Sequence, residues 1–263
     1  MTRPLLIRPF AAAHRVVVDF GQAVVAMGLA VGRAIAAAPR MKRRDFVEQL
    51  GRIAMSALPL VGIAALFAGM VIALQTSMQL TRLGMNAIVA DIVSVSLVRE
   101  LAPIFTALLM AGKAGAGLAS ELGMVTLSGQ AQAMRALGLD INRELLAPRF
   151  FAVVVGTLLL TIAAILLGLM GGMLLGSGKL GVSPVYYLNR IAYALEPIDI
   201  AVGLIKSVGF GVIIAAFGLR FGLAPKDDAA ALGKDTMRAV VSASFVILVA
   251  DHIMTVIISA VLG

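Results

Sequence analysis

Four charged residues lie inside long apolar stretches of this sequence: Arg99, Glu100, Lys206 and Asp251. A charged side chain at the centre of a bilayer costs about 2.5–3.5 kcal/mol on insertion scales, so such residues pair or line a polar path. Their formal charges sum to zero, and we expect Lys206 to pair with Asp251. Adjacent residues of a helix point about 100° apart, so we expect Arg99 and Glu100 to contact different neighbours. Two interpretations stay open: the pairs only hold helices in register, or they line a cavity for a polar headgroup or couple helix movements.

The apolar stretches define the class of protein. The chain has 263 residues, of which 60% are hydrophobic and 14% are charged, whereas soluble domains average about 25% charged residues. Five stretches are long and apolar enough to cross a hydrocarbon layer of about 30 Å. They cover residues 53–81, 92–112, 150–178, 200–219 and 239–262. The sequence therefore predicts an all-α integral membrane protein with five transmembrane helices.

Residues 1–52 are basic and amphipathic, with no piece long and clean enough to span. We predict an interfacial helix in the membrane plane, followed by a five-span permease domain over 53–263; a disordered basic tail is the alternative. Of the 22 Lys and Arg residues, 17 lie in 1–52, 113–149 and 220–238, and three lie in the connections at the other end. The positive-inside rule then predicts a cytoplasmic N-terminus and a periplasmic C-terminus.

A second pattern lies in the first predicted span. Leu66, Met70, Leu74 and Met78 recur every four residues and so stay near one helix face. Because methionine is unbranched and adaptable, such a face suits variable acyl chains. We predict that these four residues line a substrate cavity; ordinary helix packing or lipid contact is the alternative.

Several classes of chemistry are excluded by what the sequence lacks. There is no cysteine, and the two histidines are far apart, so we expect no metal site. The glycine-rich runs at 112–120 and 176–180 do not have the spacing of a phosphate-binding loop. No catalytic constellation is present, so we expect no enzyme activity in this chain. The net charge of +8 fits membrane orientation and anionic lipid; no basic run is interleaved with aromatics, so we expect no nucleic-acid partner.

The most specific motif runs from Leu97 to Phe150 and reads LVRELAPIFTALLMAGKAGAGLASELGMVTLSGQAQAMRALGLD…LLAPRF. It resembles the signature region of the MlaE/YrbE family of permeases, and the resemblance extends over nearly the whole chain. It implies a homodimer in the bacterial inner membrane, with cytoplasmic ABC ATPase subunits and periplasmic MCE-domain lipid-binding subunits. It also implies a phospholipid or related lipid as cargo, for outer-membrane lipid homeostasis. No cofactor is then expected in this chain, because ATP is bound by the partner.

The resemblance also assigns roles to residues. Arg99, Glu100, Lys206 and Asp251 match polar membrane positions of the family. Residues 121–140 match a cytoplasmic coupling helix, between the second and third spans, that sits in a groove of the ATPase. The residues that we expect to form this contact are Glu121, Leu122, Met124, Leu127, Met134, Leu137 and Asp140. The sequence departs from the family at Gly129, where an acidic residue is common, and glycine lowers the helix propensity there.

Two other functions compete with a lipid permease. An ion-coupled secondary transporter would use the same four intramembrane charges, although no internal repeat of the kind common in such proteins is evident. A scaffold that only seats a periplasmic ring would not need the specific cytoplasmic segment over 121–140. Dependence of transport on an ATPase or on a proton gradient distinguishes these hypotheses.

Overall fold

The computed structural model describes residues 27–82, 84–85, 88–179 and 183–262, so the first half of the predicted interfacial segment, residues 1–26, lies outside the described residues. All regular structure in the described part is helical. Five helical stretches are long and apolar enough to cross a membrane, which confirms the predicted fold class. They are Arg43–Thr81, Val89–Leu127, Asn142–Gly178, Pro197–Leu223 and Ala229–Val261.

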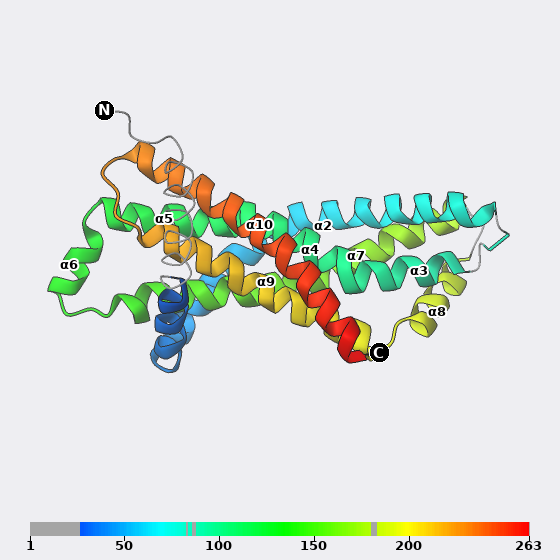
Figure 1. Cartoon of the computed structure of the whole chain (residues 1–263), viewed down its shortest axis with the longest axis horizontal. Coiled ribbons are helices and arrows are strands. Elements are labelled where there is room, and N and C mark those ends of the chain that lie inside the picture. The colour runs from blue at the N-terminus through cyan, green and yellow to red at the C-terminus, as the bar shows by residue number, and fades with distance from the viewer. Residues whose placement is uncertain (1–26, 83, 86–87, 180–182, 263) are drawn as a thin grey trace, which may run out of the picture.

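The helices that form these spans are arranged along one axis, and α10 crosses the bundle obliquely (Figure 1). The first span is α2 (Arg43–Thr81), and the second joins α3 (Val89–Ser96), η3 (Leu97–Leu101), α4 (Ala102–Met110), η4 (Ala111–Gly115) and α5 (Ala116–Leu127). The third joins η5 (Asn142–Leu146) to α7 (Ala147–Lys179), and the last two are α9 (Pro197–Leu223) and α10 (Ala229–Leu262). Two short helices connect spans, α6 (Gln130–Ala136) and α8 (Pro184–Ala194). Because the number of spans is odd, the described chain begins and ends at opposite ends of the bundle.

The N-terminal region divides into two parts. A helix over residues 27–37, followed by the short helix η1 (Ala38–Arg40), lies across the bundle axis at the end where α6 is found (Figure 1). The helix α2 then begins at Arg43, ten residues before the uncharged stretch starts. Residues 43–52 are therefore continuous with the first span and extend it beyond the apolar layer.

Close packing of the first and third spans depends on small residues. On α2, every fourth residue from Ala57 to Ser77 is small and buried, apart from Val61. A Cβ atom on Gly69 would lie 1.9 Å from the carbonyl oxygen of Gly168, and one on Gly171 would lie 2.1 Å from that of Leu66. The glycines of the third span therefore form a small-residue face, and the two backbones touch there because no side chain lies between them.

The connection between the third and fourth spans contains a helix, α8. Ser183 caps α8 by accepting a hydrogen bond from the backbone N–H of Tyr186. The ring of Tyr187 is buried against Gly172 and Gly176, where added Cβ atoms would lie 2.8 and 2.9 Å from its atoms. Its hydroxyl has no hydrogen-bond partner among the described residues. The glycines of α7 therefore leave space for the ring of Tyr187 as well as for the close approach of α2.

Burial raises the pKa of Tyr187 from 10.0 to about 12. The folded protein holds this proton more tightly than the unfolded chain. The contribution of Tyr187 to the free energy of unfolding is therefore constant below pH 10 and falls as pH rises from 10 to 12. We expect the absorbance at 295 nm of the wild type minus Tyr187→Phe to titrate with a midpoint near pH 12. A midpoint near pH 10 would contradict the buried position.

Candidate functional site

The intramembrane charges meet at one place in the bundle. Lys206 of α9 is 0% exposed, and its Nζ donates hydrogen bonds to Glu100, to Asp251 Oδ1 at 3.1 Å and to Thr255 Oγ1 at 2.7 Å. An ammonium group has three protons, and here each has an acceptor. The predicted pair of Lys206 with Asp251 is confirmed, and Glu100 and Thr255 complete the group. We call these four residues the lysine cluster; it joins the second, fourth and fifth spans.

Arg99 contacts a different neighbour from Glu100, as predicted. Its Nε lies 3.4 Å from Oδ1 of Asp199, in the first turn of α9. The other carboxylate oxygen of Asp199 accepts a hydrogen bond from the backbone N–H of Glu196 at 2.9 Å and so closes a capping box. Asp199 therefore fixes the start of α9 and holds Arg99 at the same time. The sequence pattern does not single out this residue, because it lies one position before the predicted span over 200–219.

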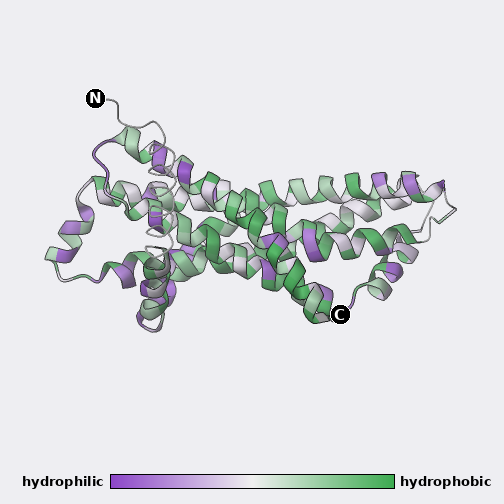
Figure 2. Cartoon of the chain, in the orientation of Figure 1, coloured by the Kyte–Doolittle hydropathy of each residue, from purple (hydrophilic) through white to green (hydrophobic). Residues whose placement is uncertain are grey.

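A local change of helix geometry presents Arg99 and Glu100. Residues Leu97–Leu101 form a π turn in which the N–H of Ala102 bonds to the carbonyl of Leu97, five residues back. Such turns insert a residue into a helix and are frequent at functional sites. Pro103, two residues after this turn, lacks an N–H and so cannot donate the α-helical hydrogen bond to the carbonyl of Arg99. In Figure 2, hydrophilic positions interrupt the hydrophobic bundle near this turn and along α10.

A small cavity adjoins the lysine cluster. It has a volume of about 260 Å³, and Arg99, Glu100 and Thr255 contribute to its lining together with Ser96 and Ser259. Val95, Val202 and Ile258 complete the wall. The cavity therefore combines a cation, a carboxylate and three hydroxyls with apolar side chains. Such a lining can hold the polar part of an amphipathic molecule.

Gly203 allows α9 to reach the π turn. A Cβ atom at this position would lie 2.3 Å from the carbonyl oxygen of Val98. We expect Gly203→Val to separate the two spans, destabilise the fold by about 1–3 kcal/mol through overpacking and reduce transport. Thermal unfolding in detergent measures the first effect. The matched control is Gly112→Val, since no atom lies within 4 Å of a Cβ at Gly112; equal losses in both variants would contradict this interpretation.

The predicted substrate stripe is offset from the packed face of α2. Leu66, Met70 and Leu74 are half-buried, and Met78 is exposed. The buried residues of this helix lie one position earlier, at Ala65, Gly69, Ala73 and Ser77. The stripe therefore borders the contact with α7 without forming its centre. Its role in a substrate cavity stays a prediction.

The segment over 121–140 is not one helix. Residues Glu121–Leu127 complete the long second span, Gly129 then adopts φ of +73°, and the short helix α6 covers Gln130–Ala136. Gly138 adopts φ of +73° and ends α6. Glycine is the residue that tolerates this left-handed conformation, so the two glycines fix the direction of α6. Figure 1 places α6 at the far end of the bundle, beyond the other helices.

The expected coupling residues divide by exposure. Leu137 is 77% exposed, and Met124 and Asp140 are also exposed, so these side chains are free to contact a partner. Leu127 is half-buried, and Met134 packs against the core. Leu122 is 1% exposed, because the backbone of α9 at Gly222 lies directly over it. The prediction that Leu122 contacts a partner is therefore wrong. Leu139, which is 45% exposed, belongs to the exposed set and was missed.

Glu121 has a partner inside the chain. Its Oε2 accepts hydrogen bonds from Arg52 at 2.9 Å and from Arg149 at 3.3 Å. These residues belong to α2, α5 and α7, so one carboxylate ties three spans together where they leave the apolar layer. At the same end, Nζ of Lys42 lies 2.9 Å from Oε2 of Glu144 and forms a further ion pair. Long-range pairs of this kind have no signal in a single sequence.

The fold and these sites define a polytopic membrane protein of the permease class, with a polar group inside the bundle and an exposed helix at one end. The family model described as Permease MlaE matches residues 46–257. The chain belongs to this family.

Named relatives agree with this assignment. An intermembrane phospholipid transport system permease protein MlaE from Haemophilus influenzae is 30% identical over 256 residues, which is 96% of this chain and 98% of the relative. A probable ABC transporter permease protein from Rickettsia felis is 34% identical over 209 residues, 80% of this chain and 81% of the relative. The chloroplastic protein TRIGALACTOSYLDIACYLGLYCEROL 1 of Arabidopsis thaliana is 31% identical over 81% of this chain and 61% of its own length.

Proposed function

We propose that this chain is the permease subunit of an ABC transporter that moves phospholipid or a related lipid between the bacterial inner membrane and a periplasmic MCE-protein route, for outer-membrane lipid homeostasis. Family membership and the name of the Haemophilus influenzae relative support the class of cargo. The observation that carries the proposal is the unbroken second span, which links the lysine cluster to the exposed segment around α6. From Glu100 to Leu127 this helical stretch covers about 40 Å at 1.5 Å per residue.

In this proposal the polar cavity beside the lysine cluster receives the lipid headgroup. Arg99 offers a cation to a phosphate, and the hydroxyls of Ser96, Thr255 and Ser259 offer further hydrogen bonds. Acyl chains would lie along apolar helix faces, including the stripe of Leu66, Met70, Leu74 and Met78. Movement of the second span would shift Glu100 relative to Lys206 and so change the shape of the cavity.

We assign ATP binding and hydrolysis to a separate cytoplasmic ABC ATPase, so this chain itself has no enzymatic role. The contact would use the exposed side chains of Met124, Leu137 and Leu139, with Asp140 at its edge. Apolar residues exposed outside the membrane layer are a common feature of protein interfaces. A push on α6 reaches the second span through Gly129 and the third span through η5, since the second span ends and the third span begins at this segment.

A second copy of the chain is the partner that we propose inside the membrane. Only 11% of the most apolar stretch of α10 is buried in the single chain, against 33–56% in the other four spans. The helix α10 also supplies Asp251 and Thr255 to the lysine cluster. Pairing of two copies along α10 would therefore place both clusters near the dimer interface.

We place the protein in the inner membrane with a cytoplasmic N-terminus and a periplasmic C-terminus. The end of the bundle that holds the N-terminal helix, α6 and the connection from α9 to α10 also holds most of the Lys and Arg residues. This asymmetry supports the orientation through the positive-inside rule. A periplasmic MCE-domain protein would then dock at the end that carries α8.

Gentle purification of the native complex tests the proposal. We expect mass spectrometry to find a second copy of this chain, an ABC ATPase, an MCE-domain protein and bound phospholipid. Recovery of this chain without an ATPase, under extraction that preserves known ABC assemblies, would contradict the proposal. That result would favour an ion-coupled transporter built on Lys206, Glu100 and Asp251.

A further inference from the structure

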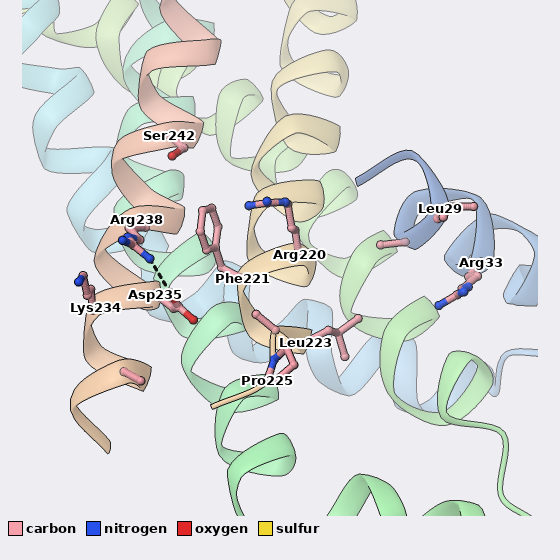
Figure 3. A pocket seen from close by; sticks show the side chains of 13 residues that line it. Leu29, Arg33, Arg220, Phe221, Leu223, Pro225, Lys234, Asp235, Arg238 and Ser242 are labelled. Atoms are coloured by element: carbon pink, nitrogen blue, oxygen red, sulfur yellow. Dashed lines mark hydrogen bonds and ion pairs between the residues drawn. The ribbon is translucent and has the colours of Figure 1, made fainter. Parts of the chain in front are cut away.

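A pocket of about 1020 Å³ opens at the end of the bundle that carries the N-terminal helix. It lies between the helix over 27–37, the end of α9 and the first turns of α10 (Figure 3). Neither the lysine cluster nor residues 121–140 contribute to its lining. Its volume is in the range of pockets that hold organic ligands rather than single ions. The transport role proposed above makes no use of it.

The lining of this pocket is strongly basic. Among the described residues it contains Arg33, Arg220, Lys234 and Arg238, against a single carboxylate, Asp235. That carboxylate is already engaged, because its oxygens lie 3.5 Å from Arg238 and 3.7 Å from Lys226. The pocket therefore has an excess of positive charge, which favours an anionic ligand.

Arg220 has unused hydrogen-bonding capacity within the described part of the chain. Its Nε is buried and has no acceptor among the described residues, and such groups are rare in native structures. Its guanidinium carbon lies 4.9 Å from the centre of the Phe221 ring, so a cation–π contact holds the group in place. In Figure 3 the side chain of Arg220 extends from α9 toward α10, and Arg33 extends toward α9 from the opposite wall.

The position and the apolar part of the lining indicate an amphipathic ligand. Leu29, Phe221 and Leu223 line the pocket beside the cations. The apolar stretch of α9 ends at Arg220, so we place this pocket at the depth of lipid headgroups. The negative end of the α9 dipole is neutralised, because Lys226 Nζ donates to the carbonyls of Phe221 and Ala224 at 2.7 and 2.9 Å.

We propose that this pocket binds the phosphate-bearing headgroup of an anionic phospholipid from the leaflet at this end of the bundle. Arg220 and Arg238 contact the phosphate from two helices, and Arg33 closes the site from the N-terminal helix. The bound lipid thereby fixes the N-terminal helix against α9 and α10. The inference does not rest on the proposed transport function.

The test uses the full chain in nanodiscs of phosphatidylcholine that contain a small fraction of phosphatidylglycerol. Lipid retained after transfer to detergent is counted by native mass spectrometry. Since each basic residue near a lipid surface contributes about fivefold, we expect Arg220→Gln/Arg238→Gln to retain about tenfold to thirtyfold less phosphatidylglycerol. The control Arg43→Gln/Arg44→Gln removes two exposed charges of the same end, outside the pocket, and should change retention less than twofold. Equal losses in both variants, or no loss in the first, would overturn the proposal.

Two further arms keep the result decisive. If Arg220→Gln prevents folding, Arg33→Gln/Lys234→Gln replaces two exposed members of the lining and is compared with the same control. Inorganic phosphate and glycerol phosphate are also titrated against the wild type at millimolar concentration. We expect neither to displace phosphatidylglycerol; full displacement would assign the pocket to a soluble phosphate and overturn the lipid assignment.

Discussion

Lys206→Met is expected to abolish lipid transport and to destabilise the protein by about 3–5 kcal/mol. The reason is that removal of one partner from a buried ion pair leaves the opposite charge uncompensated. Here Glu100 and Asp251 would both lose their cation, and Thr255 would lose a donor. Thermal unfolding in detergent and transport in proteoliposomes measure the two effects. Because methionine matches the length of the lysine stem, the loss reports charge and hydrogen bonding more than packing.

Neutralising the carboxylates separates a structural role of the cluster from a transport role. The triple variant Lys206→Met/Glu100→Gln/Asp251→Asn has no unpaired charge, so we expect it to recover most of the lost stability. We expect transport to stay absent in this variant if the cluster moves during the cycle. Full recovery of transport would mean that the charges only hold the helices in register.

The variant Leu137→Asp/Leu139→Asp is expected to lose ATP-driven transport. Its free energy of unfolding should stay within about 0.5 kcal/mol of the wild-type value. Both side chains are exposed at the end of α6, and exposed substitutions have small effects on stability. In an apolar contact with an ATPase, however, two added charges would be buried without partners. We expect the retained ATPase to fall by at least about tenfold, as for substitutions at the centre of an interface.

Val185→Asp is the matched control for the variant at α6. It adds a charge at an exposed apolar residue of α8, at the opposite end of the bundle. ATPase retention should be unchanged in this control. If the ATPase co-purifies equally well with both variants, the coupling role of this segment is refuted.

Much of the fold follows from the sequence because a membrane imposes simple rules. The five spans could be predicted from apolar length, and the pairing of Lys206 with Asp251 from the cost of an unpaired charge. The site of close approach between α2 and α7 was signalled by Gly168 and Gly171. These features depend on local composition or on the cost of leaving a charge unpaired inside the membrane.

The remainder depends on contacts between distant segments. Asp199 lies outside the predicted span over 200–219, yet α9 begins at Pro197, so Asp199 is in its first turn and reaches Arg99. The burial of Leu122 could not be predicted, because the residue that covers it, Gly222, follows 100 residues later in the sequence. The break in the coupling segment did have a signal, since Gly129 and Gly138 flank the short helix, and glycines at such positions commonly end helices.

Transfer of labelled phospholipid by the reconstituted complex tests the central claim most directly. The permease, with the ATPase and MCE-domain protein that co-purify with it, is placed in proteoliposomes, and lipid movement is followed with and without ATP and with a protonophore. A lipid ABC permease predicts transfer that requires ATP, persists with the protonophore and disappears in Lys206→Met. Transfer that proceeds without ATP and stops with the protonophore would contradict the account and identify an ion-coupled transporter.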